Sequence, residues 1–487
     1  GGGGRNRALG NCSTVGGGYF NCAAGFRSTI GGGSNNCATG IASTIAGGYF
    51  NCALGNCSTV GGGRTNCARG NCSTVGGGYC NGASGIASII GGGSCNRVLA
   101  DGSFVGGGCR NCTRGSYSNV NGGYCNFASG IGSTVGGGSR NCAIGNCSIV
   151  GGGNQNRALG DRSTIGGGYI NCATLNHATV AGGRNNCALG EYSTIGGGDS
   201  NRATATYANV DGGYFNCATA CFATVGGGAY NCARGTSSTV GGGYRNCATG
   251  NNSTVGGGCL NFATGNGATI GGGCCNCAVG SYSNVGGGRR NCAVGNCSNV
   301  GGGYLNRAGG SFSNVGGGFF NCASGIASTI GGGTYNCAGG NCSTIGGGNR
   351  NCASGNLSTV GGGRCNCAIG SYSNVGGGNR NCAAGDYSYI IGGRCSIILA
   401  SHSGSAVLGD GQSRAHTSFA ADSLTLDFDS GVYFAKPFIY GNVNFRNSGI
   451  FSLSGAVAAG LPNNPLSVVG SGNTYLQLNI QNRATGL

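Results

Sequence analysis

Valine or isoleucine returns every fifteen residues along most of the chain. The column opens with Val15, Ile30, Ile45 and Val60 and reaches Ile390 without an exception. Serine, or sometimes alanine, stands two positions before each of these residues, whereas the position between them varies freely, as in Thr14 and Phe104. Side chains two positions apart on a strand share one face. The pattern therefore predicts a short strand with Val/Ile and Ser inward and the variable residue outward.

A second strand follows in each period as the triplet Asn-x-Ala. Its asparagines, Asn21, Asn36, Asn51 and Asn66, continue unbroken to Asn381. Because Asn and Ala share a face, both are expected to point inward. Stacked asparagine side chains can hydrogen-bond along the stacking axis. We therefore predict a structural ladder made of the Asn column and the Val/Ile column.

Glycines separate the two strands. The second and third residues of each Gly-Gly-Gly group, such as Gly17 and Gly18, persist from period to period, and two variable positions follow them. A glycine that persists indicates a positive φ or a crowded backbone. One coil is thus two strands and two turns, and the period extends from Ala8 to about Gly393.

Repeats of this kind predict an all-β fold, a parallel β-solenoid of about 26 fifteen-residue coils. At ~4.8 Å per coil the rod would be on the order of 120 Å long. Each coil buries only one Val/Ile, one Ala, one Ser and one Asn. Because burial stabilises in proportion to apolar area, so thin a rod is expected to gain core by associating with sister copies.

The period divides the chain into three expected parts. Residues 1–393 form the solenoid shaft, residues 394–430 the exit from the roll, and residues 431–487 a small C-terminal β-domain that we expect to be truncated. Alternation in "SLTLDF" and "YGNVNF" indicates strands, and we expect those from about residue 420 onward to pair between chains.

The columns G-x-x-S-T-V-G-G-G-x-x-N-x-A-x-G resemble the left-handed parallel β-roll of YadA-type trimeric autotransporter adhesin heads and of phage tail fibres. "NTYLQLNIQNRATGL", residues 473–487, resembles a stretch common in phage tail-fibre proteins. The resemblance implies a homotrimeric fibre for host attachment. Its partners would be its own copies, other virion or fibre proteins at its ends, and a host glycan or lipopolysaccharide. We expect a virion surface protein; a bacterial cell-surface adhesin is the alternative.

Charge agrees with a weak attraction to acidic surfaces. The net charge is +16, charged residues are only 7% of the chain, and the arginines are scattered along the rod. Scattered cations favour acidic glycans or lipopolysaccharide over a nucleic-acid groove. No apolar run approaches the ~20 residues of a membrane span, so we expect none in this sequence.

Cysteine is the unusual component, with 34 residues. Eighteen occupy the middle of Asn-x-Ala, a position that also holds Arg97 and Gly82 and must therefore face outward. Neighbouring coils place Cα atoms ~4.8 Å apart, inside the 4.4–6.8 Å range of disulfides. We predict disulfide staples, within or between chains; free thiols at subunit contacts are the alternative. The candidate residues are Cys22, Cys37, Cys52, Cys67, Cys80, Cys95, Cys172, Cys187, Cys217, Cys232, Cys277, Cys292, Cys322, Cys337, Cys352 and Cys367.

Other chemistry has little support. Zinc sites take four ligands, typically with His, and the chain has three His and ten acidic residues in all. We expect no enzymatic activity, no cofactor, and no catalytic or metal-binding residues. The outward Thr column makes an ice-binding solenoid a remote alternative, although Ile89 and Phe104 interrupt that column.

Overall fold

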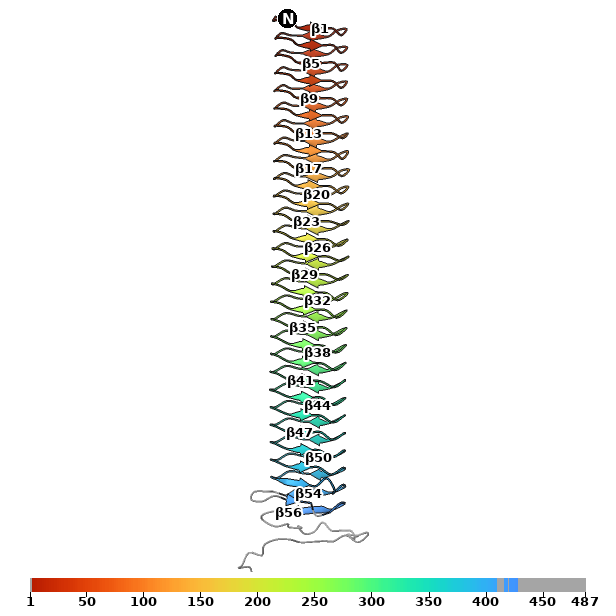
Figure 1. The fold of residues 1–487 in the computed structure, drawn as a ribbon, viewed down its shortest axis with the longest axis vertical. Coiled ribbons are helices and arrows are strands. Elements are labelled where there is room, and N and C mark those ends of the chain that lie inside the picture. The colour runs from red at the N-terminus through yellow and green to blue at the C-terminus, as the bar shows by residue number, and fades with distance from the viewer. Residues whose placement is uncertain (1, 410–415, 419, 428–487) are drawn as a thin grey trace, which may run out of the picture. The chain divides into compact units, whose positions relative to one another are not determined.

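The computed structural model describes residues 2–409, 416–418 and 420–427, and in this part of the chain every regular element is a strand. The strands stack in parallel, one coil above the next, along a single axis (Figure 1). The predicted all-β fold, a parallel solenoid of fifteen-residue coils, is confirmed. No helix among the described residues is long and apolar enough to cross a membrane.

Two ladders of two-residue strands form the solenoid. The odd-numbered ladder begins with β1 (Arg7–Ala8) and β3 (Cys22–Ala23) and reaches β51 (Cys382–Ala383) in steps of fifteen residues. The even-numbered ladder begins with β2 (Thr14–Val15) and β4 (Thr29–Ile30) and reaches β52 (Tyr389–Ile390) in the same steps. Each strand pairs with its equivalent one coil away, for example Cys22 with Cys37 and Val15 with Ile30.

The core is narrow and continuous. Ile30, Ile45 and Val60 are fully buried, as are the alanines of the odd-numbered strands from Ala23 onward, and Val15 packs against the same cluster at the N-terminal end. The serine before each Val/Ile is also buried, yet many of these hydroxyls, such as that of Ser238, have no hydrogen-bond partner among the described residues. Ala178, Ala208, Ala223 and Ala268 replace this serine and are equally buried.

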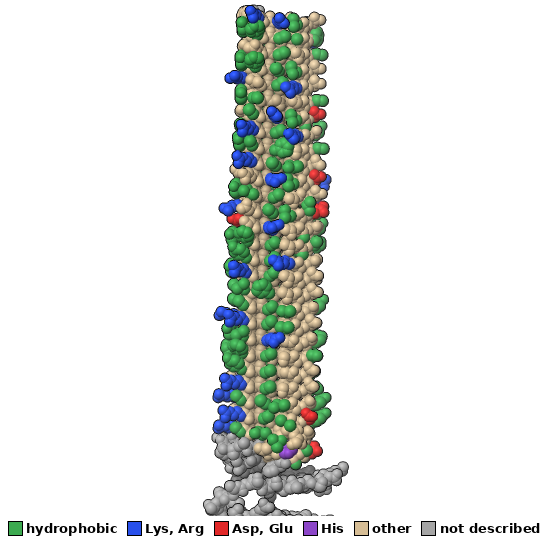
Figure 2. All heavy atoms as spheres, in the orientation of Figure 1, with side chains coloured by type: hydrophobic (Ala, Val, Ile, Leu, Met, Phe, Trp, Pro, Cys, Tyr) green, Lys and Arg blue, Asp and Glu red, His purple; other side chains and the backbone are tan. Residues whose placement is uncertain are grey.

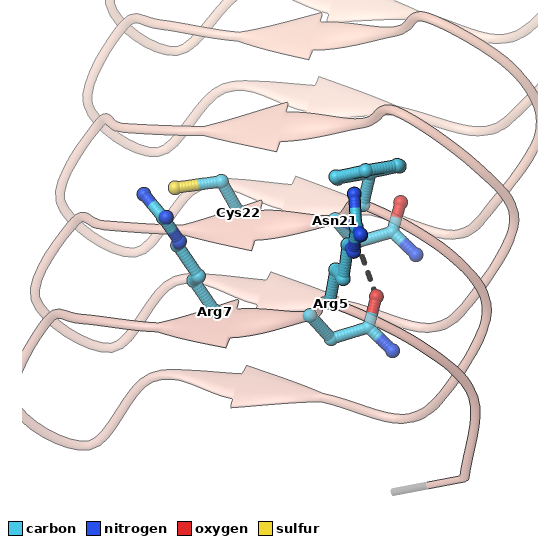
Figure 3. Close-up of a pocket in the computed structure, with 6 residues that line it drawn as sticks. Arg5, Arg7, Asn21 and Cys22 are labelled. Atoms are coloured by element: carbon cyan, nitrogen blue, oxygen red, sulfur yellow. Dashed lines mark hydrogen bonds between the residues drawn. The ribbon is translucent and has the colours of Figure 1, made fainter.

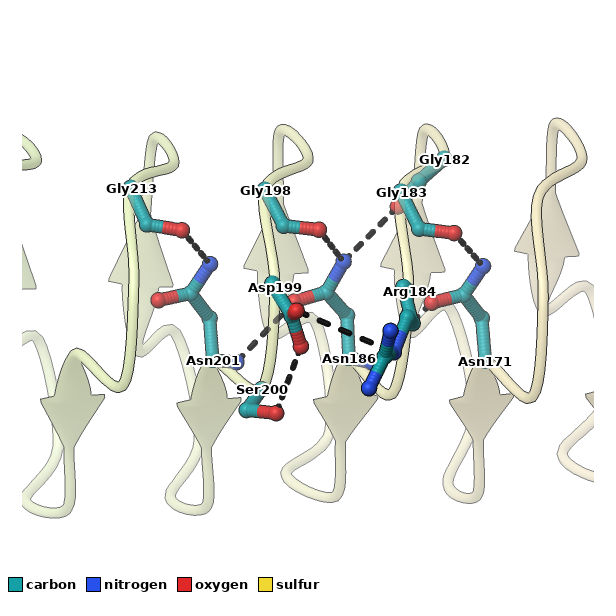
Figure 4. A network of polar contacts seen from close by, with 10 residues as sticks. All are labelled: Asn171, Gly182, Gly183, Arg184, Asn186, Gly198, Asp199, Ser200, Asn201 and Gly213. Carbon is teal, nitrogen blue, oxygen red and sulfur yellow. Dashed lines mark hydrogen bonds and ion pairs between the residues drawn. The ribbon is translucent and has the colours of Figure 1, made fainter.

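The asparagine ladder is bonded mainly to the backbone, not amide to amide. Asn21, Asn36, Asn51 and Asn66 are at most 1% exposed. Figure 4 shows the repeating unit, in which the Asn201 amide donates to the carbonyl of Gly213 (2.9 Å). The same amide also donates to the carbonyl of Gly197 (2.8 Å). Its oxygen accepts from the backbone N–H of Asn216 at 2.9 Å. A single side chain thus joins its own turn to the next coil, through one carbonyl and one backbone N–H of that coil.

The three glycines of a turn have different structural roles. Gly183 has φ +84, and a Cβ there would collide with the Gly198 carbonyl and lie 2.6 Å from the Asn186 amide nitrogen. Gly182, one residue earlier, has open space around it. Crowding and a positive φ therefore explain the third glycine of the group, whereas open space surrounds the second in nearly every coil.

Each coil also carries two positions in the left-handed region, which the sequence pattern did not predict. They lie just before the Asn and just before the Ser columns, and most are filled by residues other than glycine, such as Phe20 (φ 55) and Arg27 (φ 57). At these points the backbone N–H reverses its direction: Phe20 donates to Gly4 of the preceding coil, whereas Cys22 donates to Asn36 of the following coil. The side chains consequently project outward at both turns.

Past Gly393 the coils widen but the parallel pairing continues. Strand β53 (Ser396–Ile398) pairs with β51 and with β55 (His416–Thr417). Strand β54 (Ala406–Gly409) pairs with β52 and with β56 (Leu424–Asp427) of the same chain. The described residues 394–409, 416–418 and 420–427 therefore extend the solenoid. The strand at 424–427 pairs with β54 of its own chain, whereas pairing between chains was expected from about residue 420. The expected C-terminal domain, residues 431–487, lies outside the described residues.

Candidate functional site

Outward side chains form columns that follow the solenoid axis. Figure 2 shows hydrophobic and basic side chains in such columns, with few acidic ones on the face in view. The left-handed positions stack aromatic rings one coil apart: His177, Tyr192, Tyr207 and Phe222 have ring centroids 4.5–5.0 Å apart and nearly parallel planes. These rings contact one another because every coil repeats the same backbone.

Arginines lie among the exposed aromatic rings. The Arg64 guanidinium is 5.5 Å from the Tyr49 ring and 5.9 Å from the Tyr79 ring, and Arg245 is similarly placed over Tyr230 and Tyr244. Cation–π contacts at exposed sites contribute about 0.5–1 kcal/mol. The turn columns therefore present flat apolar rings and fixed positive charges together.

The cysteines of the odd-numbered strands form one half-buried column. Their alanine neighbours point inward and are fully buried, so the thiols point outward as expected. Adjacent coils bring them into register in runs. The runs are Cys22–Cys37–Cys52–Cys67, Cys172–Cys187, Cys217–Cys232–Cys247, Cys277–Cys292 and Cys322–Cys337–Cys352–Cys367–Cys382.

In several runs a thiol that accepts hydrogen bonds from its neighbours has a lowered pKa. Hydrogen bonds from Cys217 and Cys247 lower the pKa of Cys232 to about 3, and Arg234 adds to this effect with its Nε 3.0 Å from the sulfur. The same bonds raise the pKa values of Cys217 and Cys247, since ionising them would remove the donated proton. For Cys142, which has no cysteine neighbour in the column, burial raises the pKa.

All 34 cysteines are free thiols in this structure. The predicted partners Cys22 and Cys37, like Cys172 and Cys187, are direct neighbours in register. Cys80 and Cys95 lie elsewhere, at left-handed turn positions with φ near 58. The disulfide staples stay a prediction, and the geometry that bears on them is taken up below.

Clusters suited to other chemistry are few. Among the described residues, no three His, Cys, Asp or Glu side chains converge on a point that could hold a metal ion. A surface hollow lies on the first two coils, between Arg5 and Arg7 on one and Asn21 and Cys22 on the next (Figure 3). It is the N-terminal end of the outward columns described above. Here the Asn21 N–H donates to the Asn6 side-chain oxygen, and the equivalent asparagines of the following coils form the same bond.

Sequence comparison supplies no further guide to the function, because no protein-family model and no curated protein matches the chain. The sequence-based reading also overlooked a feature of the thiol column. Arg157 and Arg202 directly flank the run Cys172–Cys187, and Arg307 lies between the last two runs. The sequence contains this feature, because reading every fifteenth residue of the column shows which cysteine runs have an arginine next to them.

Proposed function

We propose that the protein is a structural fibre protein of a virion, the shaft of a tail or capsid fibre that serves attachment to a host surface. The observation that carries this proposal is the unbroken register of the two ladders from β1 to β52. The first coils and β56 lie at opposite ends of this stack (Figure 1). A solenoid in which each coil contacts only its neighbours gains length without gaining thickness, which is what a spacer needs.

The surface supports an attachment role. Columns of exposed Tyr, Phe and Arg offer rings that can stack on sugars and cations that can pair with acidic groups. The net charge of +16 favours acidic glycans or lipopolysaccharide as the host partner. Self-association into a homotrimer would add core to a chain whose own core is narrow, and the two ends would join other fibre proteins.

Immunoelectron microscopy tests the location. Antibodies raised against the solenoid should label fibres that project from purified virions. Labelling of a bacterial cell surface with unlabelled virions would contradict the proposal and favour the adhesin alternative. Binding of the purified protein to lipopolysaccharide, measured with and without added salt, tests the partner separately, because an electrostatic contact weakens as salt rises.

A further inference from the structure

We propose that the runs of in-register thiols bind soft metal ions that take two ligands, with Cu(I) as the chemical class of ion, one ion between two thiolates of neighbouring coils. This site is independent of the fibre role. It rests on the spacing of the thiols, on their coordination number and on the charges beside them.

The spacing suits a bridging ion better than a disulfide. Successive coils repeat the same backbone, so equivalent atoms of Cys337 and Cys352 are separated by about one strand spacing, ~4.8 Å. A disulfide needs Cβ atoms 3.5–4.5 Å apart, so closing one here requires the backbone to shift. A metal–thiolate bond of ~2.3 Å on each side of an ion spans about 4.6 Å in a straight line.

The coordination number selects the ion. Because no three ligating side chains converge among the described residues, the column lacks the tetrahedral set that structural zinc requires. What remains is a pair of outward-pointing thiolates, side by side along the solenoid axis, such as Cys337 and Cys352. Thiolate sulfur is a soft donor that selects Cu(I) over harder ions.

The charges beside the runs offset part of the negative charge of the product. A Cu(I) ion with two thiolates carries one negative charge. Every run of two or more cysteines has an arginine directly next to it in the column at one end or both. The adjacent pairs are Arg7–Cys22, Arg157–Cys172, Cys187–Arg202, Arg202–Cys217, Cys292–Arg307 and Arg307–Cys322.

Metal binding deprotonates both thiols of a pair. On binding, each of the two S–H bonds breaks, each sulfur keeps its electron pair and forms a bond to Cu(I), and two protons leave to solvent. The copper stays in its +1 state, so no oxidant or reductant is consumed.

The test compares two double variants of the full chain, reduced and loaded with excess Cu(I) without oxygen, then desalted. In C337S/C367S the remaining cysteines of the longest run have no thiol neighbour in the column, so bound copper should fall by about two ions per chain. The control C112S/C142S also removes two cysteines of this column, but their neighbours are Arg97, Phe127 and Arg157. It should bind as much copper as the parent. Both should fold, because this column also accepts Gly82 and Phe127.

Copper content by elemental analysis and the number of sulfurs per copper by X-ray absorption provide the readouts. The proposal expects two sulfurs per copper in the parent. Equal copper loss from the two double variants, copper that leaves the parent on desalting, or three or four sulfurs per copper would each overturn it.

Discussion

Asparagine at every fifteenth position forms hydrogen bonds to the backbone of two successive coils. Its amide offers two donors and its oxygen accepts a third bond, so one buried side chain satisfies two turn carbonyls and one backbone N–H. Aspartate lacks the donors, and serine lacks the reach to two carbonyls. This accounts for a polar column that stays constant from Asn21 to Asn381 beside the Val/Ile, Ala and Ser columns of the core.

Replacing Asn201 by alanine should destabilise its coil and the next. The change leaves the Gly197 carbonyl and the Asn216 N–H without a partner among the described residues, at about 1–3 kcal/mol for each group, whereas the Gly213 carbonyl keeps its bond from the Asp199 N–H. Native-state hydrogen exchange of these coils measures the loss. Ser238→Ala is the control and should change local stability by less than ~0.5 kcal/mol, because its buried hydroxyl has no partner in the described structure. Equal effects of the two substitutions would refute the role of the ladder.

Thiol reactivity should depend on pH differently at Cys322 and Cys142. A hydrogen bond from Cys337, assisted by Arg307, lowers the pKa of Cys322 to about 6, whereas burial raises that of Cys142. Since the thiolate is the nucleophile, reduced Cys322 should react with iodoacetamide at pH 7 and slow as the pH falls through about 6. Cys142 should stay slow at both values.

Mass spectrometry of the alkylated peptides gives both rates. Cys337→Ala should raise the pKa of Cys322 and slow its reaction at pH 7, while Cys342→Ala, an exposed cysteine outside the column, should not. Indistinguishable profiles for Cys322 and Cys142 would contradict the hydrogen-bonded run.

At the scale of the coil, the two glycines of the turn at residues 181–183 should respond differently to substitution. Gly183→Ala should destabilise the coil by about 2 kcal/mol or more, because alanine disfavours φ +84 and its Cβ meets the next coil's backbone. Gly182→Ala has open space and should change stability by less than ~0.5 kcal/mol. Thermal unfolding and limited proteolysis of the two variants provide the comparison, and the account fails at this point if G182A is the more damaging.

The strands and the inward columns were predictable because a strict fifteen-residue period makes both recognisable in the sequence. Val/Ile at one position and Asn at another require the same environment in every coil. The left-handed turn positions were not predictable from residue type. Phe20, Arg27 and Cys80 adopt the left-handed backbone conformation, which Gly and Asn usually occupy. The bonding of Asn201 to carbonyls also could not be read from the sequence, since those acceptors belong to glycines whose orientation only the fold determines.

The thiol column was predictable as an outward face but not as a set of runs with different chemistry. Its positions hold Cys, Arg, Gly or Phe, and no neighbouring residue in the sequence indicates which. Only the register shows that Cys232 receives hydrogen bonds from two neighbours while Cys142 faces Phe127 and Arg157.

At the scale of the whole molecule, we expect three chains to associate. One coil buries a single Val or Ile and a single Ala as its apolar core, and columns of Tyr, Phe and Ile remain exposed. Light scattering of the reduced protein in native buffer should give a mass near three times the 47.1 kDa of one chain. A mass of one chain would show that the solenoid is stable alone and that its exposed rings serve another purpose.

We conclude that fifteen-residue coils stack along one axis to form a rod. Electron cryomicroscopy of the reduced, full chain tests this stacking most directly. We expect an elongated particle with a repeat of ~4.8 Å along its long axis. The stack should be on the order of 130 Å long, because each ladder has 28 strands. A compact particle, or a 4.8 Å spacing that runs across the long axis, would contradict it.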